Sequence, residues 1–485
     1  MRLAAEIEHF IFEPEDESLP EFTVLEFTGK ESISQLTHFE IDITCAENNL
    51  DFSKLLNRRA SLKIWCFQDN DYSRVYHGII SSFEQIREEG DYGIYRAVMV
   101  PMLWRLTLKY QSRVFQEKSV PEIIEQILTE SGFQADDYRN ALQGSYELLN
   151  QVPREFCIQY RESDFNFISR LMEEEGIFYF FEYGDDKEVI VIADDSTVHE
   201  STSPISEIRY ELPSRLQPIE EEYIHPLRYK QSVVTANVKL KDFNYDTPQT
   251  NLLVSSQNDQ DSDTIYYDYP GRFGFLDHGT DLAAVRNEEI AAGHKLIFGG
   301  SNCRSLCAGY LFTLTEHPRD ELMQEYLLTG VSHHGVQGGT LATDVETSYD
   351  NIFECIPSQV QYRPARITSK PVIKGTQTAI IVGPEGEEIY VDEKGRVKAQ
   401  FHWDLEGEYN ESSSCWIRVS QRWAGNGWGG MFIPRIGQEV IVDFLEGDPD
   451  KPIIVGSVYN GDHQPPYPLP DEKTKSTINS NSSVG

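Results

Sequence analysis

The stretch from Val391 to Asn460 decides the fold that we expect for the C-terminal part of the chain. It begins VDEKGRVKAQFHWD (391–404) and, after a polar break, continues CWIRVSQRWAGNGWGGMFIPRIGQEVIVDFLEGDPDKPIIVGSVYN (415–460). Apolar and polar side chains alternate over residues 397–403. That period of two places one set of side chains on each face of a β-strand.

Two further strands and a turn extend this pattern. Residues 439–445 and 452–458 are apolar runs, and Gly447-Asp448-Pro449-Asp450 between them has the composition of a tight turn. Four or five short strands with glycine-rich corners in about 70 residues predict a small closed barrel of the oligonucleotide/oligosaccharide-binding (OB) type.

Composition limits what such a barrel binds. The chain has 485 residues, which exceeds a single hydrophobic core and predicts at least two domains. Its 42 basic and 79 acidic residues give a net charge of −37, which disfavours nucleic acid and anionic lipid as partners. Residues 380–470 carry 7 Lys and Arg against 15 Asp and Glu, so this region lacks the basic groove of a single-strand-binding barrel.

The cysteines and the N-terminus indicate folding in the cytosol. A chain of this size needs no disulfide framework, so we expect reduced, buried thiols. The first ten residues lack the apolar run of a signal peptide, and no stretch has the ~18 apolar residues of a membrane helix. The seven cysteines are Cys45, Cys66, Cys157, Cys303, Cys307, Cys355 and Cys415.

Most of the chain before residue 375 is predicted to be strand, with three helices. Alternating patterns predict antiparallel strands with one exposed face. Helices are predicted around 119–132, 163–176 and 280–292 from their caps and apolar periodicity. The predicted strands lie at 22–27, 39–45, 60–67, 75–80, 95–100, 189–192, 233–240, 310–314, 325–333 and 352–357.

Three segments are predicted to lack packed structure. Residues 247–263 are the weakest-ordered by composition, and residues 370–378 mark the boundary before the C-terminal barrel. The proline-rich residues 465–470 form a stiff linker, after which the sequence has the character of the start of a longer element.

Metal sites are disfavoured by spacing. Asp259, Asp261 and Asp263 begin like a calcium loop, but Thr264 and Pro270 stand where that loop needs Gly and Glu. Cys303 and Cys307 have no second pair for zinc. His333-His334 is interpreted as a surface pair at a strand end.

Catalytic motifs are also missing from the sequence. Glu173-Glu174-Glu175 is interpreted as a solvated charge cluster at a helix end rather than as an acid–base group. The stretch GNGWGG (425–430) lacks the Lys-Ser/Thr ending of a phosphate loop and is interpreted as a barrel corner. We therefore predict no catalytic, metal-binding or cofactor-binding residue.

The tryptophans of the C-terminal stretch divide into two groups. Trp403 and Trp416 alternate with polar residues, so we expect them in the core. Trp423 and Trp428 lie in the glycine-rich loop, where exposure is expected. A stacking platform for sugars or bases and a contact with a partner copy both remain open for them.

Four long motifs carry a family resemblance. DEKGRVKAQFHWD, SCWIRVSQxWAG, FIPRIGQEVIVDFLEGDPDxPIIVGSVYN and ESDFNFISRLMEEEGIFYFF resemble the VgrG (Vgr/Rhs-element) spike proteins of type VI secretion systems. The resemblance extends over the whole chain. The residues that carry it in the barrel are Gly395, Arg396, Phe401, His402, Trp403, Trp416, Trp423, Trp428, Pro434, Gly437, Gly447, Asp448, Pro449 and Gly456.

The resemblance implies a mainly β protein with helical insertions. Residues 1–375 would form a phage-hub-like region with two β-barrel subdomains, and residues 380–470 an OB-fold spike base. Residues 471–485 would be a linker and the first residues of a trimeric β-helix needle. In the family the needle continues further, so we interpret the end at Gly485 as a truncated or lost needle.

The resemblance also implies a mechanical function without catalysis or cofactor. A homotrimer would sit on a ring of the Hcp tube, among baseplate components. Its needle would carry a PAAR tip protein and effectors or adaptors and puncture a membrane of the target cell. The protein would assemble in the cytoplasm of a Gram-negative bacterium and then be secreted or injected.

Two alternatives stay open at this stage. The first is the baseplate hub and spike of a phage or a phage-tail-like particle, which is mechanically alike. The second, from a different class, is a carbohydrate-binding or hydrolytic protein that uses the OB barrel.

Overall fold

The structure, a computed structural model, divides into two compact units, each assembled from separated segments of the chain. Cys66, Asp261 and residues 482–485 lie outside the part of the chain that it describes. The described residues are 9–65, 73–90, 92–144, 151–211, 222–260, 263–339 and 346–481. Unit 1 comprises residues 1–106, 128–150 and 169–367, and unit 2 comprises residues 107–127, 151–168 and 368–485.

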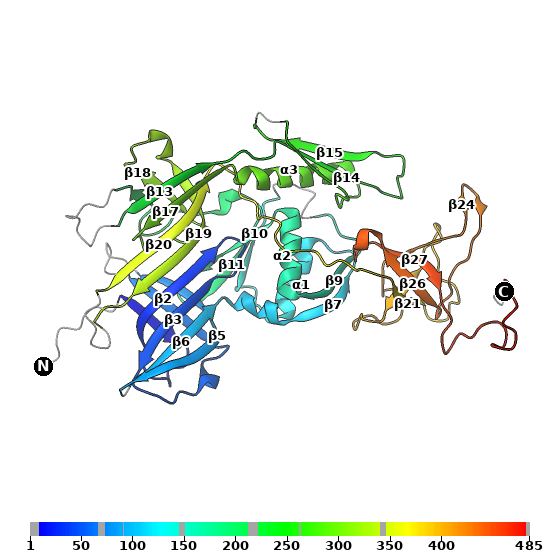
Figure 1. Cartoon of the computed structure of the whole chain (residues 1–485), viewed down its shortest axis with the longest axis horizontal. Helices are drawn as coiled ribbons and strands as arrows, with labels where there is room; N and C mark the ends of the chain where they lie inside the picture. The colour runs from blue at the N-terminus through cyan, green and yellow to red at the C-terminus, as the bar shows by residue number, and fades with distance from the viewer. Residues whose placement is uncertain are drawn as a thin grey trace. The chain divides into compact units, whose positions relative to one another are not determined.

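A sheet of twelve strands dominates unit 1 (Figure 1). Ten strands follow the order β1-β4-β5-β6-β3-β2-β19-β20-β17-β13, while β18 pairs with β19 and β12 with β18. The strands predicted at 22–27, 39–45, 75–80, 95–100 and 325–333 all belong to it, which confirms those predictions. The bounds are β1 Phe10–Pro14, β2 Thr23–Ser32, β3 His38–Cys45, β4 Arg59–Trp65, β5 Ser73–Glu89, β6 Tyr92–Val100, β12 Glu207–Arg209, β13 Ile224–Gln231, β17 Lys295–Ser301, β18 Leu311–Thr315, β19 Glu325–Val336 and β20 Ser348–Pro357.

The pairing of β2 with β19 joins the N-terminal strands to strands from the second half of unit 1. It runs antiparallel from Ser32 opposite Gly330 to Glu26 opposite Val336. Because β19 also pairs with β20, it is a central strand of the sheet. The blue β2 and the yellow-green β19 lie side by side in Figure 1. Two β regions that are separate in the sequence therefore share one sheet.

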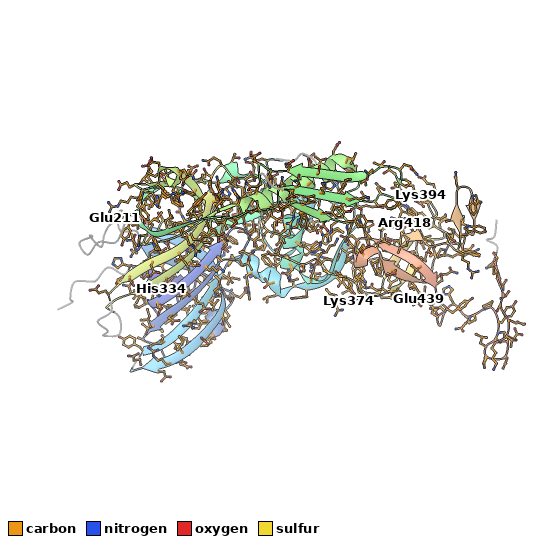
Figure 2. The ribbon with its side chains drawn as sticks, turned by 45° about the horizontal axis from the view of Figure 1, so that its top comes forward. Glu211, His334, Lys374, Lys394, Arg418 and Glu439 are labelled. Carbon is orange, nitrogen blue, oxygen red and sulfur yellow. The ribbon has the colours of Figure 1, made fainter. Side chains whose placement is uncertain are left out.

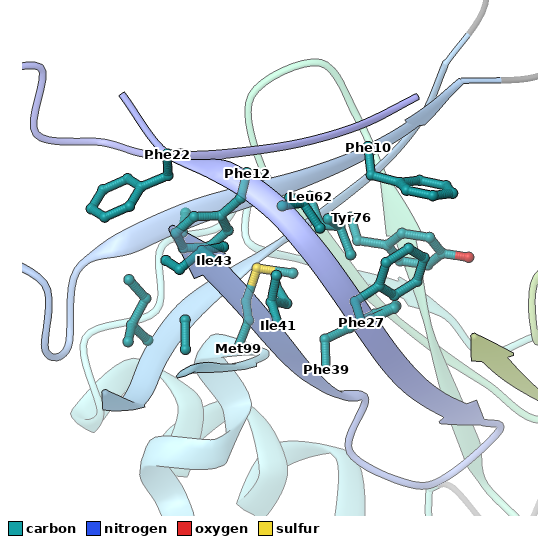
Figure 3. Packing of buried hydrophobic residues seen from close by; sticks show 14 of the residues in the cluster. Phe10, Phe12, Phe22, Phe27, Phe39, Ile41, Ile43, Leu62, Tyr76 and Met99 are labelled. Carbon is teal, nitrogen blue, oxygen red and sulfur yellow. The ribbon is translucent and has the colours of Figure 1, made fainter. Parts of the chain in front are cut away.

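Aromatic and aliphatic side chains of the first strands form a large buried core (Figure 3). The Phe10 ring meets the Phe27 ring edge-on at 5.1 Å, and the Phe39 ring approaches the Tyr76 ring to 4.7 Å. Burial of each such side chain stabilises the fold by ~1.5–3 kcal/mol. A Cβ on Gly335 would lie 2.2 Å from the Phe27 ring, so the β2–β19 pairing requires glycine there.

Smaller elements complete unit 1. A parallel–antiparallel sheet has the order β10-β11-β8, and a second has the order β15-β14-β16 with helix α3 packed on it. Their bounds are β8 Tyr138–Ala141, β10 Phe178–Tyr183, β11 Glu188–Ala193, β14 Asn237–Asp242, β15 Leu252–Gln257, β16 Ile265–Asp268 and α3 Leu276–Ala292.

Three helices agree with the sequence-based expectation in position. The Ser119 amide and hydroxyl both donate to Glu122 at 2.8 Å, the capping box that begins α1 (Val120–Glu130). Gly176, with φ +71°, ends α2 (Asp164–Glu175). α3 begins four residues before the predicted start at 280. Its first turn holds Gly279, which obscures the apolar periodicity but packs against the Phe273 ring.

The prediction of a solvated acidic cluster at 173–175 is wrong. Glu173, Glu174 and Glu175 are 7%, 8% and 4% exposed. The end of α2 is covered on more than one face, so the charges need partners inside the unit. Glu174 forms an ion pair with Arg272, and its carbonyl accepts a hydrogen bond from Arg366. A single sequence gives no sign of these partners, which lie about a hundred residues or more away.

The prediction that 247–263 is the weakest-ordered segment is also wrong for its middle part. Residues 252–257 form β15, which pairs antiparallel with β14 from Leu252 opposite Asp242 to Gln257 opposite Asn237. Leu252 and Val254 contribute to the core beneath α3. Polar flanks mask this short apolar run, which is stabilised by pairing and burial rather than by local propensity.

The interpretation of His333-His334 as a surface pair holds for only one residue. His334 is exposed and bonds Glu26 at 3.0 Å (Figure 2). His333 is 2% exposed, because alternate side chains of a central strand point into the core. Its Nε2 lies 2.9 Å from Glu31 Oε1 and its Nδ1 lies 2.7 Å from the Tyr349 hydroxyl.

The Glu31 carboxylate accepts further hydrogen bonds from buried side chains. The Tyr76 hydroxyl donates to Oε1 at 3.2 Å and the Cys307 thiol to Oε2 at 3.3 Å. Burial raises the pKa of Cys307 well above its ordinary value, so this thiol is a donor and not a nucleophile. The six cysteines within the described residues are all buried, as expected, and none of these six is joined in a disulfide.

In the ranges given above, no helix has the length and apolar character needed to span a membrane. The same residues contain no group of three or more His, Cys, Asp or Glu side chains that could hold a metal ion.

The contrast between the two neighbouring histidines gives the first testable prediction. We expect His333→Ala to lower the free energy of unfolding by about 2 kcal/mol or more, because it removes the buried imidazole that bonds both the Glu31 carboxylate and the Tyr349 hydroxyl. His334→Ala removes only exposed interactions and should change the free energy of unfolding by less than ~1 kcal/mol. Urea-induced unfolding of both variants measures the difference. Equal effects would contradict the assigned burial.

Candidate functional site

A five-stranded sheet forms the centre of unit 2, in the order β22-β21-β26-β27-β23. An antiparallel bridge between Val397 and Ile417, with hydrogen bonds of 3.0 and 2.7 Å, also links the two edge strands β22 and β23. The strands predicted at 397–403, 439–445 and 452–458 are confirmed. The bounds are β21 Gln377–Val382, β22 Lys398–Phe401, β23 Arg418–Val419, β26 Glu439–Phe444 and β27 Pro452–Ser457.

The same unit contains a two-stranded sheet and the core that supports the site. β7 (Tyr110–Phe115) pairs antiparallel with β9 (Cys157–Ser163). Ile158 of β9 joins a core that also includes Ala399, Phe401 and Val440 of the five-stranded sheet. The sheet is therefore packed on chain segments that precede it by more than two hundred residues.

Trp403 and Trp416 are half-buried. The Trp403 ring stacks on Phe401 at 5.1 Å, and its indole N–H donates to Gln377 at 2.8 Å. The Trp416 ring packs on Tyr390 at 4.8 Å, with the Lys398 ammonium 5.3 Å from its centre. Both indoles thus belong to the framework of the unit.

The turn at Gly395 is fixed by an aspartate. Gly395 has φ +73°, and the Arg396 guanidinium donates to Asp392 at 2.6 Å. Burial acts to raise the pKa of Asp392, but hydrogen bonds from Arg396 and its charge outweigh burial and lower the pKa. His402, directly after the end of β22 at Phe401, is exposed and bonds the Thr378 hydroxyl at 3.0 Å.

A buried ion cluster organises the Gly-Asp-Pro-Asp turn. Lys370 Nζ lies 2.7 Å from Asp448 Oδ1 and 2.6 Å from Asp450 Oδ2, and its side chain is 9% exposed. Asp450 also accepts a hydrogen bond from the Ile158 amide at 2.6 Å. A Cβ on Gly447, where φ is +70°, would lie 2.7 Å from Val372. The turn is therefore held against both β9 and the segment that leads into the five-stranded sheet.

Four other predicted positions also have structural roles. Pro434 and Pro449 are buried, and Gly437 has φ +87°, a conformation that favours glycine. Gly456 lies in β27, next to the register shift between Ile441 and Val442 of β26.

Sequence reasoning missed Lys370, Asp450 and Gln400 as organising residues. Lys370 was only a boundary marker, and Gln400 was one member of the polar set of a strand. Gln400 is 0% exposed, and its amide bonds the Asp404 carbonyl at 3.1 Å and the Tyr409 amide at 3.4 Å. The alternating pattern places Gln400 on the polar face of the strand, so the sequence carried no signal of its burial.

Trp423 and Trp428 form an exposed aromatic hairpin, which we define as residues 423–432. β24 (Ala424–Gly425) and β25 (Trp428–Gly429) form its strands, and the two indoles meet edge-on at 4.9 Å. Trp423 is 66% exposed and Trp428 58%; Met431 and Phe432 are 70% and 53% exposed. Four large apolar side chains in ten residues are a typical feature of a protein–protein contact.

Comparison with known proteins agrees with this architecture. The model of the phage tail baseplate hub family (GPD) matches residues 30–339. The model of the type VI secretion system/phage-baseplate injector OB domain matches residues 387–459. The spike protein VgrG1a of Pseudomonas aeruginosa is 38% identical over 462 residues, which cover 94% of this chain and 70% of that protein. The chain belongs to the VgrG family of type VI secretion spike proteins.

Other VgrG proteins are longer than this chain. VgrG1b of Pseudomonas aeruginosa is 38% identical over 466 residues, and the match spans 94% of this chain but 61% of that protein. The actin cross-linking toxin VgrG1 of Vibrio cholerae is 36% identical, with 97% and 43% covered. The chain thus spans less than two thirds of these two relatives.

Solved structures share the fold. An Escherichia coli type VI secretion component, described as similar to the T4 bacteriophage tail proteins gp27 and gp5, aligns with a TM-score of 0.67 at 22% identity. That alignment covers 92% of this chain and 99% of that chain. A chain of the Francisella PdpA–VgrG complex aligns with a TM-score of 0.59 at 11% identity, covering 93% and 71%.

The ion cluster gives a testable prediction with a control four residues away. Lys370→Met should lower the free energy of unfolding by about 3–5 kcal/mol, because it leaves two buried carboxylates without their cation. Lys374→Met changes an exposed lysine and should alter the free energy of unfolding by less than ~0.5 kcal/mol. Chemical denaturation followed by tryptophan fluorescence measures both. A Lys370→Met variant as stable as the control would show that the cluster does not hold the turn.

Proposed function

We propose that the chain is the hub and spike base of a type VI secretion system and acts as a homotrimer on a ring of the Hcp tube. Residues 1–375 form the hub-like region with two β-barrel subdomains, and residues 380–470 form the OB-fold spike base. Residues 471–485 lead into a β-helix needle. One observation carries the proposal: hub and injector models match successive parts of a single chain that is 38% identical to a spike protein over nearly its whole length.

The partners follow from this position. The hub contacts the tube ring and baseplate components, and the needle carries a PAAR tip protein and effectors or adaptors. The assembly forms in the bacterial cytoplasm and is then driven outward, through the membrane of a target cell. Structural precedent for partner binding in the family comes from the PdpA–VgrG complex of Francisella.

The aromatic hairpin is the part of unit 2 that we assign to contact between copies. Its four large apolar side chains are exposed in the single chain, and burial of such groups is the main favourable term in protein association. The remaining family-motif residues, such as Gly395, Gly447 and Asp448, shape the turns of the barrel and do not contact a ligand in this proposal.

The oligomeric state tests the proposal directly. We expect light scattering of the purified chain to give three times the chain mass of 55.6 kDa, and an Hcp ring to be retained by the immobilised chain. A monomer that binds a sugar saturably would instead favour the carbohydrate-binding alternative. A trimer that binds a phage tail tube but not an Hcp ring would favour a phage baseplate. The match to the phage tail baseplate hub family is the observation that supports this alternative.

The hairpin has its own prediction. Trp423→Ser combined with Trp428→Ser should weaken trimer formation by about tenfold or more, because aromatic side chains dominate the binding energy of such contacts. Leu405→Ser, at a 91% exposed position of the same unit, serves as the control and should leave the association unchanged. Sedimentation equilibrium over a range of concentrations measures both variants. If the double variant formed trimers as stable as those of the control, the hairpin would not be part of the interface.

A further inference from the structure

The small sheet β15-β14-β16 of unit 1 is covered on only one of its faces by α3. Val238 and Leu240 of β14 and Leu252 and Val254 of β15 point toward the helix, where they are buried with Leu282. Because strand side chains alternate, the next set points away from α3. We call this second side the outer face.

The outer face carries large apolar side chains at neighbouring positions. Leu253 is 45% exposed, Ile265 55% and Tyr267 57%. In the register, Tyr267 lies opposite Lys239 and Leu253 opposite Lys241. Phe243 and Tyr269, just beyond the strand ends, are 55% and 50% exposed. Five such side chains on one small sheet exceed the scattered apolar residues of an ordinary surface.

The charges of these strands are separated between the two faces. Lys239 and Lys241 alternate with the residues that face α3 and therefore belong to the outer face. Asp242 is 5% exposed, faces inward, and accepts backbone hydrogen bonds from Phe243 at 2.7 Å and Arg272 at 2.6 Å. The outer face is thus apolar and locally basic in a chain whose net charge is −37.

A groove lies at one end of the outer face. It has a volume of about 580 Å³ and is lined by Lys241, Asp242, Phe243, Tyr267, Tyr269 and the loop of residues 248–252. The Asp242 carboxylate is occupied by the backbone amides of Phe243 and Arg272. Aromatic walls with a lysine at the rim suit an inserted apolar or acidic side chain of a partner protein. The face therefore combines a flat apolar surface with a recess.

We propose that the outer face of β15-β14-β16 docks onto an acidic surface of a second copy of this chain. The inference rests on the proposed homotrimer and names one of its contact surfaces. Copies with a charge of −37 repel one another at long range, so association requires surfaces that are apolar and locally basic. The outer face has both properties, and the 79 acidic residues of each copy supply the complementary charge.

A charge placed on the outer face tests this docking, with a matched control in the same unit. Tyr267→Glu should raise the dissociation constant of the oligomer by about tenfold or more, since it puts an acidic group against an acidic surface. Tyr92→Glu makes the same change at a 47% exposed tyrosine of β6 and should leave the constant unchanged. Sedimentation equilibrium measures association, and circular dichroism checks that both variants are folded.

A second measurement does not depend on how Tyr267→Glu folds. A photo-crosslinking phenylalanine analogue at position 267, in a mixture of 14N- and 15N-labelled chains, should give crosslinked peptides of mixed label that map to an acidic segment. A trimer that shows neither these peptides nor weakening by Tyr267→Glu overturns the docking but leaves the homotrimer intact. A wild-type chain that stays monomeric at all concentrations overturns both. Crosslinks to a different protein only would also overturn the docking.

Discussion

The antiparallel pairing of β2 with β19 is the constraint on which unit 1 depends. It connects residues that are about three hundred positions apart and turns two β regions into a single twelve-stranded sheet. Closing so long a loop costs conformational entropy, which the pairing and the burial around it must offset. Gly335 gives the Phe27 ring its space, and the buried Glu31–His333 contact adds a polar link across the same two strands.

Buried charge recurs wherever distant segments of one unit meet. In unit 1, Glu174 at the acidic end of α2 forms an ion pair with Arg272 and accepts a hydrogen bond from Arg366. In unit 2, Lys370, in the segment before the five-stranded sheet, forms ion pairs with Asp448 and Asp450. Such pairs add little net stability compared with apolar packing, but losing one partner is costly. They therefore define which segments pack together.

Much of this arrangement could be predicted from the sequence, and the rest could not for a physical reason. The strands at 397–403 and 439–445 follow from a period of two, and the Ser119–Glu122 capping box marks the start of α1. Those signals are local. The burial of Glu174 and His333 depends on partners far along the chain, and β15 depends on pairing with β14 and on burial beneath α3. The exposure of Trp423 and Trp428 agrees with expectation, because glycine-rich loops seldom bury large side chains.

Two exposed apolar surfaces, the aromatic hairpin of unit 2 and the outer face of unit 1, remain on the isolated chain, and our account assigns both to contacts between copies. The most direct test is a cryo-electron microscopy structure of the purified chain bound to an Hcp ring. The account predicts three copies around one axis, with Trp428 and Tyr267 each buried against a neighbouring copy. Single copies on the ring, or a threefold particle that leaves both residues facing solvent, would contradict it.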